Sequence, residues 1–189
     1  MSAWTRSLLV DGPEQTRALA ETLGAQLRAG DLLVLTGELG AGKTTFTQGL
    51  GRGLGVREGI ISPTFVLVRR HPSLVGGPDL VHVDAYRLSS AAEVDDVDLE
   101  DTLDAAVTVV EWGTGKVEHL ADSRLEITIE RAVGADPLTP GDAGEPADGL
   151  TGEDDGEDDD AEPRRITLTG VGPRWADGPP RLGPPPRQG

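Results

Sequence analysis

The stretch LLVLTGELGAGKT, residues 32–44, decides the fold of this chain. Its first four residues form an unbroken apolar run, as expected for a buried parallel strand. Residues 37–44 match the pattern G-x4-G-K-[ST], in which glycines let backbone N–H groups surround phosphate oxygens. A helical stretch follows from about Lys43 to Leu54 and ends at Gly55, so the loop precedes the positive N-terminus of a helix. The stretch therefore predicts a nucleotide phosphate site in an α/β protein.

Two side chains of this loop suit that chemistry. Lys43 can reach the β- and γ-phosphates of a nucleotide, and the Thr44 hydroxyl is a suitable ligand for Mg²⁺. Lysine occurs only twice in the chain, at positions 43 and 116, against fifteen arginines. A chain that otherwise uses arginine has lysine where a compact positive charge is needed, which favours a phosphate-binding role over a coincidental match to the pattern.

The flanking pattern predicts a largely parallel sheet. Leu19, Leu23 and Leu27 form one apolar stripe of a helix that begins after residues 11–13. The other strand candidates are residues 4–10 (an edge strand), 65–68, 80–84, 106–111 and 125–129. Strands separated by helical segments imply right-handed crossovers, so we expect a P-loop NTPase-like α/β fold, with a mostly parallel central sheet and helices on both faces.

The domain organisation follows from length and charge. The 189 residues suit one domain, and the net charge of −16 is concentrated in one place. Residues 134–162 carry 12 acidic side chains and no basic ones. We expect residues 134–163 to be a disordered acidic insertion and the Gly/Pro-rich residues 170–189 to be a disordered tail. The predicted P-loop domain is then residues 1–133 plus a returning strand at 164–169.

Composition excludes several classes of protein. The chain has no cysteine, so disulfides, Cys-ligated metals and thiol nucleophiles are absent. No apolar run approaches the ~20 residues of a membrane span, and the first residues do not resemble a signal peptide, so we expect a cytoplasmic protein with no membrane contact. The acidic total argues against direct nucleic-acid binding, which requires clustered Lys and Arg.

Two acidic residues end apolar runs in the same way, Asp84 after residues 80–83 and Glu111 after residues 106–110. Because ligands of open α/β sheets bind beyond the carboxyl ends of the strands, we expect both carboxylates to face the phosphate loop. One would hold Mg²⁺, directly or through water, and the other would orient the attacking water. The pattern leaves open which carboxylate touches the metal.

Other residues have a functional and a structural interpretation. Thr64 is either a switch residue that senses the γ-phosphate or a threonine that opens a strand. Trp112 either stacks on a base or partner or packs on the sheet edge. His82 lies inside an apolar strand, which favours a satisfied core histidine over a catalyst.

The chain contains no asparagine, so the Asn-Lys-x-Asp guanine reader is impossible and ATP is preferred over GTP. A small-molecule kinase is an alternative, although it would add an arginine-rich lid, whereas the long insertion here is acidic and would repel ATP. A nucleotide-dependent adaptor without catalysis is a second alternative.

The chain carries four motifs in order: residues 37–46 (GELGAGKTTF), 62–65 (SPTF), 82–87 (HVDAYR) and 111–112 (EW). Together they resemble the TsaE family, the bacterial ATPases of threonylcarbamoyladenosine formation on tRNA. The resemblance implies a single P-loop domain that works with TsaB and TsaD on adenosine 37 of tRNAs reading ANN codons, with tRNA contacted only indirectly.

The resemblance also implies roles for residues. Lys43, Thr64, Asp84 and Glu111 would form the catalytic and switch region, and Thr44 and Glu111 would ligate Mg²⁺. The implied ATP-binding residues are Gly37, Glu38, Leu39, Gly40, Ala41, Gly42, Lys43, Thr44, Thr45 and Trp112. The acidic insertion and the tail depart from the family's compact pattern, so a C-terminal nucleotide contact at Arg164 or Arg165 stays open.

Overall fold

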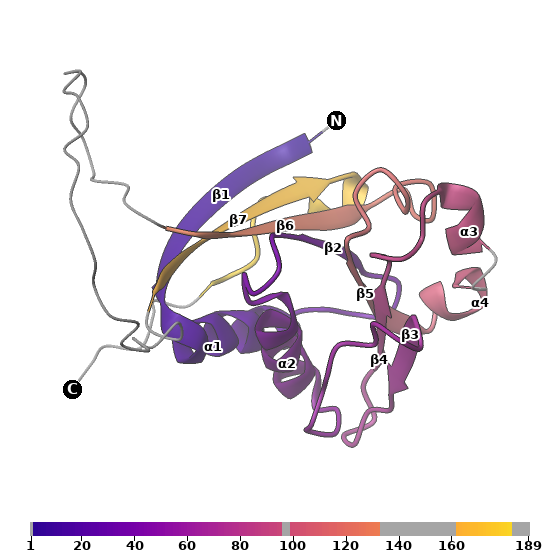
Figure 1. Ribbon diagram of the computed structural model, residues 1–189, viewed down its shortest axis with the longest axis horizontal. Helices are drawn as coiled ribbons and strands as arrows, with labels where there is room; N and C mark the ends of the chain where they lie inside the picture. Colours follow the sequence, from indigo (N-terminus) through magenta and orange to yellow (C-terminus); the bar gives the residue numbers. More distant parts are fainter. Residues whose placement is uncertain (1, 96–98, 133–161, 183–189) are drawn as a thin grey trace, which may run out of the picture.

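The computed structural model describes residues 2–95, 99–132 and 162–182. Its central sheet has seven strands in the order β1-β7-β6-β2-β5-β4-β3 (Figure 1). In chain order the elements are β1 (Ser2–Asp11), α1 (Gly12–Gly24), β2 (Leu32–Thr36), α2 (Lys43–Leu54), β3 (Val68–His71), β4 (Asp79–Asp84), α3 (Ala91–Asp95), α4 (Glu100–Leu103), β5 (Ala106–Glu111), β6 (Arg124–Arg131), β7 (Pro163–Val171) and the 3₁₀ turn η1 (Pro173–Trp175).

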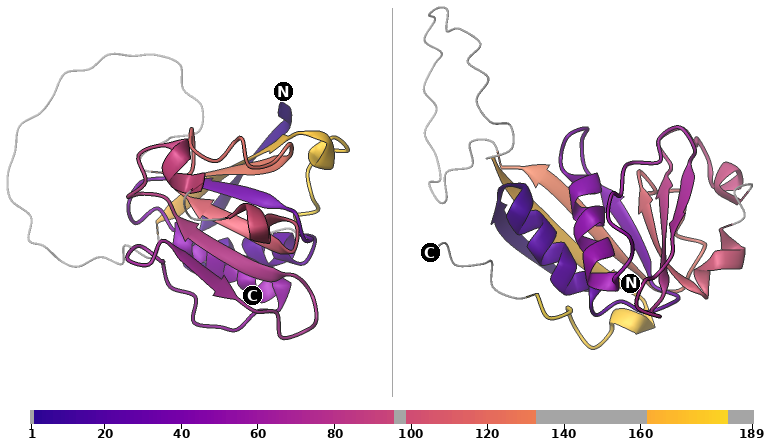
Figure 2. Two further views of the ribbon diagram at one scale, coloured as in Figure 1. Left: turned by 90° about the vertical axis from the view of Figure 1, so that its right-hand side faces the viewer. Right: turned by 90° about the horizontal axis from the view of Figure 1, so that it is seen from below.

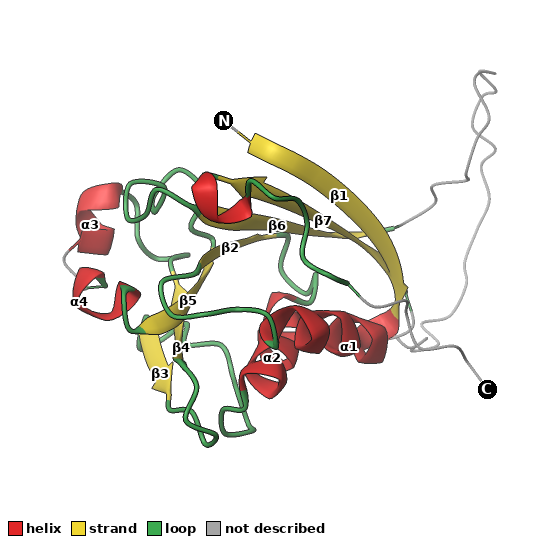
Figure 3. Ribbon diagram, turned by 180° about the vertical axis from the view of Figure 1, so that it is seen from behind, coloured by secondary structure: helices red, strands yellow, loops and turns green. Residues whose placement is uncertain are grey.

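The sheet is parallel in its centre and antiparallel at both edges. Strands β6, β2, β5 and β4 pair in parallel. At one edge β3 runs antiparallel to β4, and at the other β7 runs antiparallel to β6 and β1 antiparallel to β7. The predicted α/β fold is confirmed. The sheet, expected to be mostly parallel, is a mixed sheet whose four central strands are parallel. Figure 3 shows β1 as the long outer strand of the antiparallel edge.

Helices cover both faces of the sheet, as expected. Alternate residues of β2 point to opposite faces: Leu33 and Leu35 join the apolar cluster beneath α1 and α2, and Leu32 and Val34 join the cluster that includes α3 and α4. Burial on both faces explains the unbroken apolar run of this strand. Figure 2 shows α1 and α2 lying side by side on one face.

Helices α1 and α2 approach each other closely because α2 presents glycines to α1. A Cβ at Gly53 would lie 2.2 Å from the Glu21 carbonyl oxygen, and one at Gly49 would lie 2.4 Å from the Arg17 carbonyl oxygen. Larger side chains would force the helices apart. The contact fixes α2, and with it the phosphate loop at its N-terminus, relative to the sheet.

The strand predicted at residues 65–68 is wrong. Strand β3 begins only at Val68, and the side chain of Phe65 is 89% exposed. The amides of Val66 and Leu67 both donate to the Pro63 carbonyl, and Leu67 has φ of 64°, in the left-handed region. A chain that turns in this way cannot pair as a strand, so the apolar residues lie on an exposed turn instead.

The prediction of a disordered tail from residue 170 is wrong for residues 170–182. Strand β7 is longer than the predicted 164–169 and runs from Pro163 to Val171. Trp175 is buried, its carbonyl accepts a hydrogen bond from Trp4 Nε1 at 2.7 Å, and Arg174 forms an ion pair with Asp31 at 2.9 Å. One tryptophan and one arginine therefore anchor a segment whose composition suggests disorder.

Residues 133–161 and 183–189 lie outside the described residues, so the predicted acidic insertion and the end of the tail stay predictions. None of the helices among the described residues is both long enough and apolar enough to cross a membrane.

Candidate nucleotide-binding site

The loop between β2 and α2 has a backbone that requires glycine. Gly40 and Gly42 have φ of 76° and 104°, in the left-handed region that other residues rarely adopt. At Gly37 a Cβ would lie 2.5 Å from the Ile129 carbonyl oxygen, so this glycine lets the loop pack directly against β6. The loop is therefore set by its glycines at the carboxyl end of the parallel strands.

Lys43 begins α2 and returns toward the loop. Its side chain is buried, and its ammonium donates to the Gly37 carbonyl at 2.8 Å and the Glu38 carbonyl at 2.9 Å. Burial lowers the pKa of Lys43, while the nearby carboxylates of Glu111 and Asp84 act in the opposite direction and raise it. The lysine thus lies inside the loop, with two carboxylates close enough to affect its protonation.

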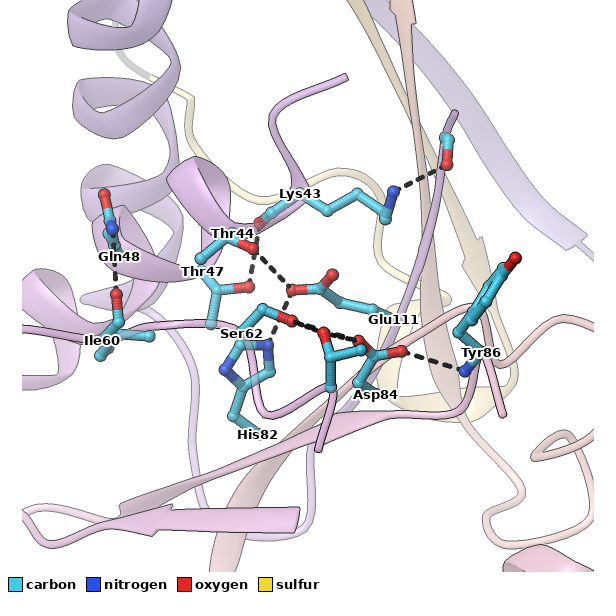
Figure 4. A network of polar contacts seen from close by, with 12 residues as sticks. Lys43, Thr44, Thr47, Gln48, Ile60, Ser62, His82, Asp84, Tyr86 and Glu111 are labelled. Carbon is cyan, nitrogen blue, oxygen red and sulfur yellow. Dashed lines mark hydrogen bonds and ion pairs between the residues drawn. The ribbon is translucent and has the colours of Figure 1, made fainter. Parts of the chain in front are cut away.

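The two predicted carboxylates lie side by side. Asp84 ends β4 and Glu111 ends β5, and the two residues are register partners in the parallel pair. Both are buried, and the Thr44 hydroxyl donates to Glu111 Oε1 at 3.3 Å (Figure 4). The structure therefore brings together the three oxygen-bearing side chains that the sequence pointed to.

Asp84 is held by hydroxyl groups from the segment before β3. Its Oδ2 accepts hydrogen bonds from Thr64 Oγ1 at 2.8 Å and Ser62 Oγ at 3.1 Å, and its Oδ1 accepts one from the Tyr86 amide at 3.0 Å. Thr64 thus lies in the candidate site and does not open a strand. Residues 62–64 are fastened to the end of β4.

The indole ring of Trp112 lies against the ammonium of Lys43. The lysine ammonium lies 4.1 Å from the centroid of the indole ring, and Tyr86 contacts the same ring edge-on at 5.4 Å. Trp112 has φ of 61°, an unusual backbone conformation for a bulky residue that turns the chain sharply after Glu111.

Most of the predicted residues line one cavity of about 310 Å³. Its lining residues are Leu39, Gly40, Gly42, Lys43, Thr44, Thr45, Ser62, Thr64, Asp84, Glu111 and Trp112. The remaining predicted residues, Gly37, Glu38 and Ala41, line a cavity of about 510 Å³ beside the end of β6, which Trp112 also borders. Leu39 is 90% exposed although it belongs to the loop.

A third cavity of about 250 Å³ continues from the first, with which it shares Gly40, Gly42 and Thr45. It is lined further by the start of α1 (Gly12, Pro13, Thr16) and by Arg164 of β7. Arg164 is buried, whereas its neighbour Arg165 is exposed. Of the two arginines that the sequence left open, Arg164 is the one beside the loop.

Two site residues were not predicted as such. Ser62 bonds to Asp84, and His82, expected to be a satisfied core histidine, places Nε2 2.8 Å from Glu111 Oε1. The signal available for His82 was its spacing: it precedes Asp84 by two residues, so the two side chains lie on one face of β4.

The fold and the glycine loop between β2 and α2 define a P-loop-like α/β protein. The comparisons with known proteins narrow this class. The family model described as "Threonylcarbamoyl adenosine biosynthesis protein TsaE" matches residues 10–136. The chain belongs to the TsaE family.

Individual relatives support the assignment to this family. The chain is 52% identical over 161 residues to a protein of Streptomyces coelicolor named "tRNA threonylcarbamoyladenosine biosynthesis protein TsaE", and the match covers 85% of this chain and 93% of the relative. A protein of Bacillus subtilis with the same name is 40% identical over 121 residues, covering 64% and 74%. The crystal structure of Bacillus subtilis YdiB superposes with a TM-score of 0.63 at 30% identity, covering 93% of this chain and 90% of that one.

Proposed function

We propose that this TsaE family member, whose role lies in threonylcarbamoyladenosine biosynthesis, binds and hydrolyses ATP in a Mg²⁺-dependent manner as one component of a tRNA-modifying complex. The complex would modify adenosine 37 of tRNAs reading ANN codons, with TsaB and TsaD as partners, in the cytoplasm. The observation that carries the proposal is the contact between the Thr44 hydroxyl and the Glu111 carboxylate beside Lys43.

The donor set fits a magnesium nucleotide. Mg²⁺ prefers oxygen ligands and is commonly bound through one or two protein groups together with substrate phosphates. Thr44 and Glu111 supply one hydroxyl and one carboxylate, at the N-terminus of α2 where anions are favoured. When bound, Mg²⁺ would neutralise developing charge on the phosphates.

The other side chains have separate roles in this proposal. Lys43 binds the β- and γ-phosphates. Asp84 orients the attacking water and anchors Thr64, whose hydroxyl is positioned to sense the γ-phosphate. The rest of the nucleotide would lie in the adjoining cavity that the start of α1 and Arg164 line.

The described arginines support an indirect contact with tRNA. Only two adjacent arginine pairs occur, Arg69-Arg70 and Arg164-Arg165. Arg70 forms an ion pair with Asp79 at 2.7 Å, and Arg164 is buried. A polyanion is bound by clustered exposed cations, and each pair has one member that is ion-paired or buried. We therefore expect the partners to carry the tRNA contact.

The test is ATP hydrolysis by the protein reconstituted with TsaB, TsaD and tRNA. Glu111→Gln retains the side-chain shape and removes the charge, so we expect hydrolysis to fall by about 100-fold while nucleotide binding without Mg²⁺ persists. Glu126→Gln, a carboxylate on β6 that is paired with Arg124, is the matched control and should hydrolyse at the wild-type rate.

Each alternative predicts a different result. Phosphate transfer to a small acceptor instead of water would indicate a kinase. If Glu111→Gln hydrolyses ATP like the wild type, Glu111 is only a strand-end residue. If tRNA modification survives without hydrolysis, the protein is a nucleotide-dependent adaptor.

A further inference from the structure

The buried histidine beneath Glu111 has a position that packing alone does not explain. His82 is fully buried in β4 between Val81 and Val83, whose side chains join the apolar cluster on the opposite face of the sheet. His82 itself faces α2, and its Nε2 lies 2.8 Å from Glu111 Oε1 (Figure 4). The imidazole is therefore a polar group placed directly under the candidate metal ligand.

The hydrogen bonds around Glu111 restrict its carboxylate. Oε1 accepts from His82 Nε2 and from Thr44 Oγ1, one from below and one from the phosphate loop. In the part of the chain that the structure describes, Oε2 makes no hydrogen bond. Two donors on one oxygen fix the orientation of the side chain and leave the other oxygen available to a ligand.

The chemistry of the pair assigns the hydrogen. A carboxylate only accepts, so Nε2 of His82 must be the donor. Nδ1 is buried and has no partner among the described residues, which suits the unprotonated nitrogen of that tautomer. The other imidazole nearby, His71, has its ring centroid 6.5 Å away and does not contact Glu111. The one hydrogen bond that the His82 ring makes within the described residues is thus directed at Glu111.

We infer that His82 is a positioning residue that holds the Glu111 carboxylate against Thr44 and thereby sets the affinity of the site for Mg²⁺. This inference rests on the proposed role of Glu111 in binding the metal. His82 is fully buried beneath Glu111, so it would act only through that carboxylate. Groups that orient metal ligands commonly contribute ten- to a hundred-fold to metal affinity, about as much as the inference requires.

The test measures binding of the non-hydrolysable analogue adenylyl imidodiphosphate to the full-length protein by calorimetry, with and without Mg²⁺. In His82→Leu we expect the gain in affinity from Mg²⁺ to fall about tenfold, with the Mg²⁺-free affinity unchanged within about twofold. His82→Gln, whose amide nitrogen reaches about as far as Nε2, should restore the gain. His71→Leu makes the same change one strand away and should behave as the wild type.

Two further variants separate the outcomes. If His82→Leu does not fold, His82→Asn replaces it, because the asparagine amide is one bond too short to reach Glu111. Loss of the Mg²⁺-dependent gain in affinity in His82→Asn, with the gain retained in His82→Gln, supports the inference. In a Glu111→Gln background the His82 substitution should have no further effect, since it acts through Glu111. An undiminished gain in folded His82→Leu, or in His82→Asn where Leu does not fold, overturns the positioning role. If the wild type gains nothing from Mg²⁺, or Glu111→Gln keeps the gain, the proposed metal site itself is wrong.

Discussion

The parallel centre of the sheet and its antiparallel flank bury different kinds of side chain. In the parallel centre, Lys43, His82, Asp84 and Glu111 are all buried, and each bonds to a neighbour or to the loop backbone. In the antiparallel flank of β1, β7 and residues 172–182, buried side chains are mostly apolar and pack on the cluster under α1 and α2. The centre concentrates polar groups that are costly to bury, and the flank adds apolar contact.

The difference teaches where stability and function can be separated. Burying charged groups disfavours folding unless they are paired, so the centre gains little stability from its polar residues. Apart from Arg164 at its border, the flank contains none of the residues proposed to bind phosphate or metal. Its apolar side chains contribute to stability through burial. Substitutions in the flank should lower stability and spare binding, and those in the centre should do the reverse.

The largest effect is expected in the flank. Trp175→Ala should reduce the free energy of unfolding by about 4 kcal/mol, because it empties a buried aromatic site. Chemical denaturation measures the loss, and nucleotide affinity in the folded protein should not change. Trp112→Ala, at the half-buried tryptophan beside Lys43, should cost less than half as much stability. Equal losses of stability in Trp175→Ala and Trp112→Ala would contradict the difference between the flank and the centre.

Lys43→Ala should produce the opposite pattern. ATP affinity should fall by about 100-fold, as charge-assisted hydrogen bonds to phosphate are lost, and stability should be retained, because removing a buried ammonium relieves desolvation. Calorimetry measures the affinity. Arg52→Ala removes one positive charge from the last turn of the same helix and serves as the control; a similar loss there would mean that only net charge matters.

The smallest effect is expected at the segment fastened to Asp84. Ser62→Ala and Thr64→Ala each remove one hydroxyl hydrogen bond to Oδ2, so each should lower stability by about 1 kcal/mol. Only Thr64→Ala should reduce ATP hydrolysis with the partners present, because Thr64 has the proposed switch role. Equal hydrolysis by the two variants would show that the segment is structural.

Local patterns predicted the elements next to the phosphate loop best. Strand β2 and helix α2 lie where expected, since the apolar run, the glycines and the left-handed Gly55 at the helix end are all local signals. The strand predicted at residues 65–68 failed because an apolar run does not reveal the left-handed backbone of Leu67. The prediction of a disordered tail failed because the residue that holds Trp175, Trp4, is 171 residues away in the sequence, so no local pattern shows the contact.

The site was predictable to the extent that its residues form motifs. Lys43, Thr44, Asp84 and Glu111 come together as strand-end and loop residues. The contact between His82 and Glu111 spans 29 residues and two strands, so it depends on the register of β4 against β5. No pattern within one segment contains that register.

The pairing of β1 with β7 has a consequence for how the chain is made. Thr5 and Thr169 share a hydrogen bond although they are 164 residues apart. At usual rates of synthesis, roughly 10–30 s separate the two residues on the ribosome. Among the described strands β1 lies at the edge and pairs only with β7, so it has no partner strand until β7 has been synthesised. A terminated chain that lacks residues 163–171 would leave both β1 and the adjoining side of β6 unpaired, which are strand edges open to aggregation.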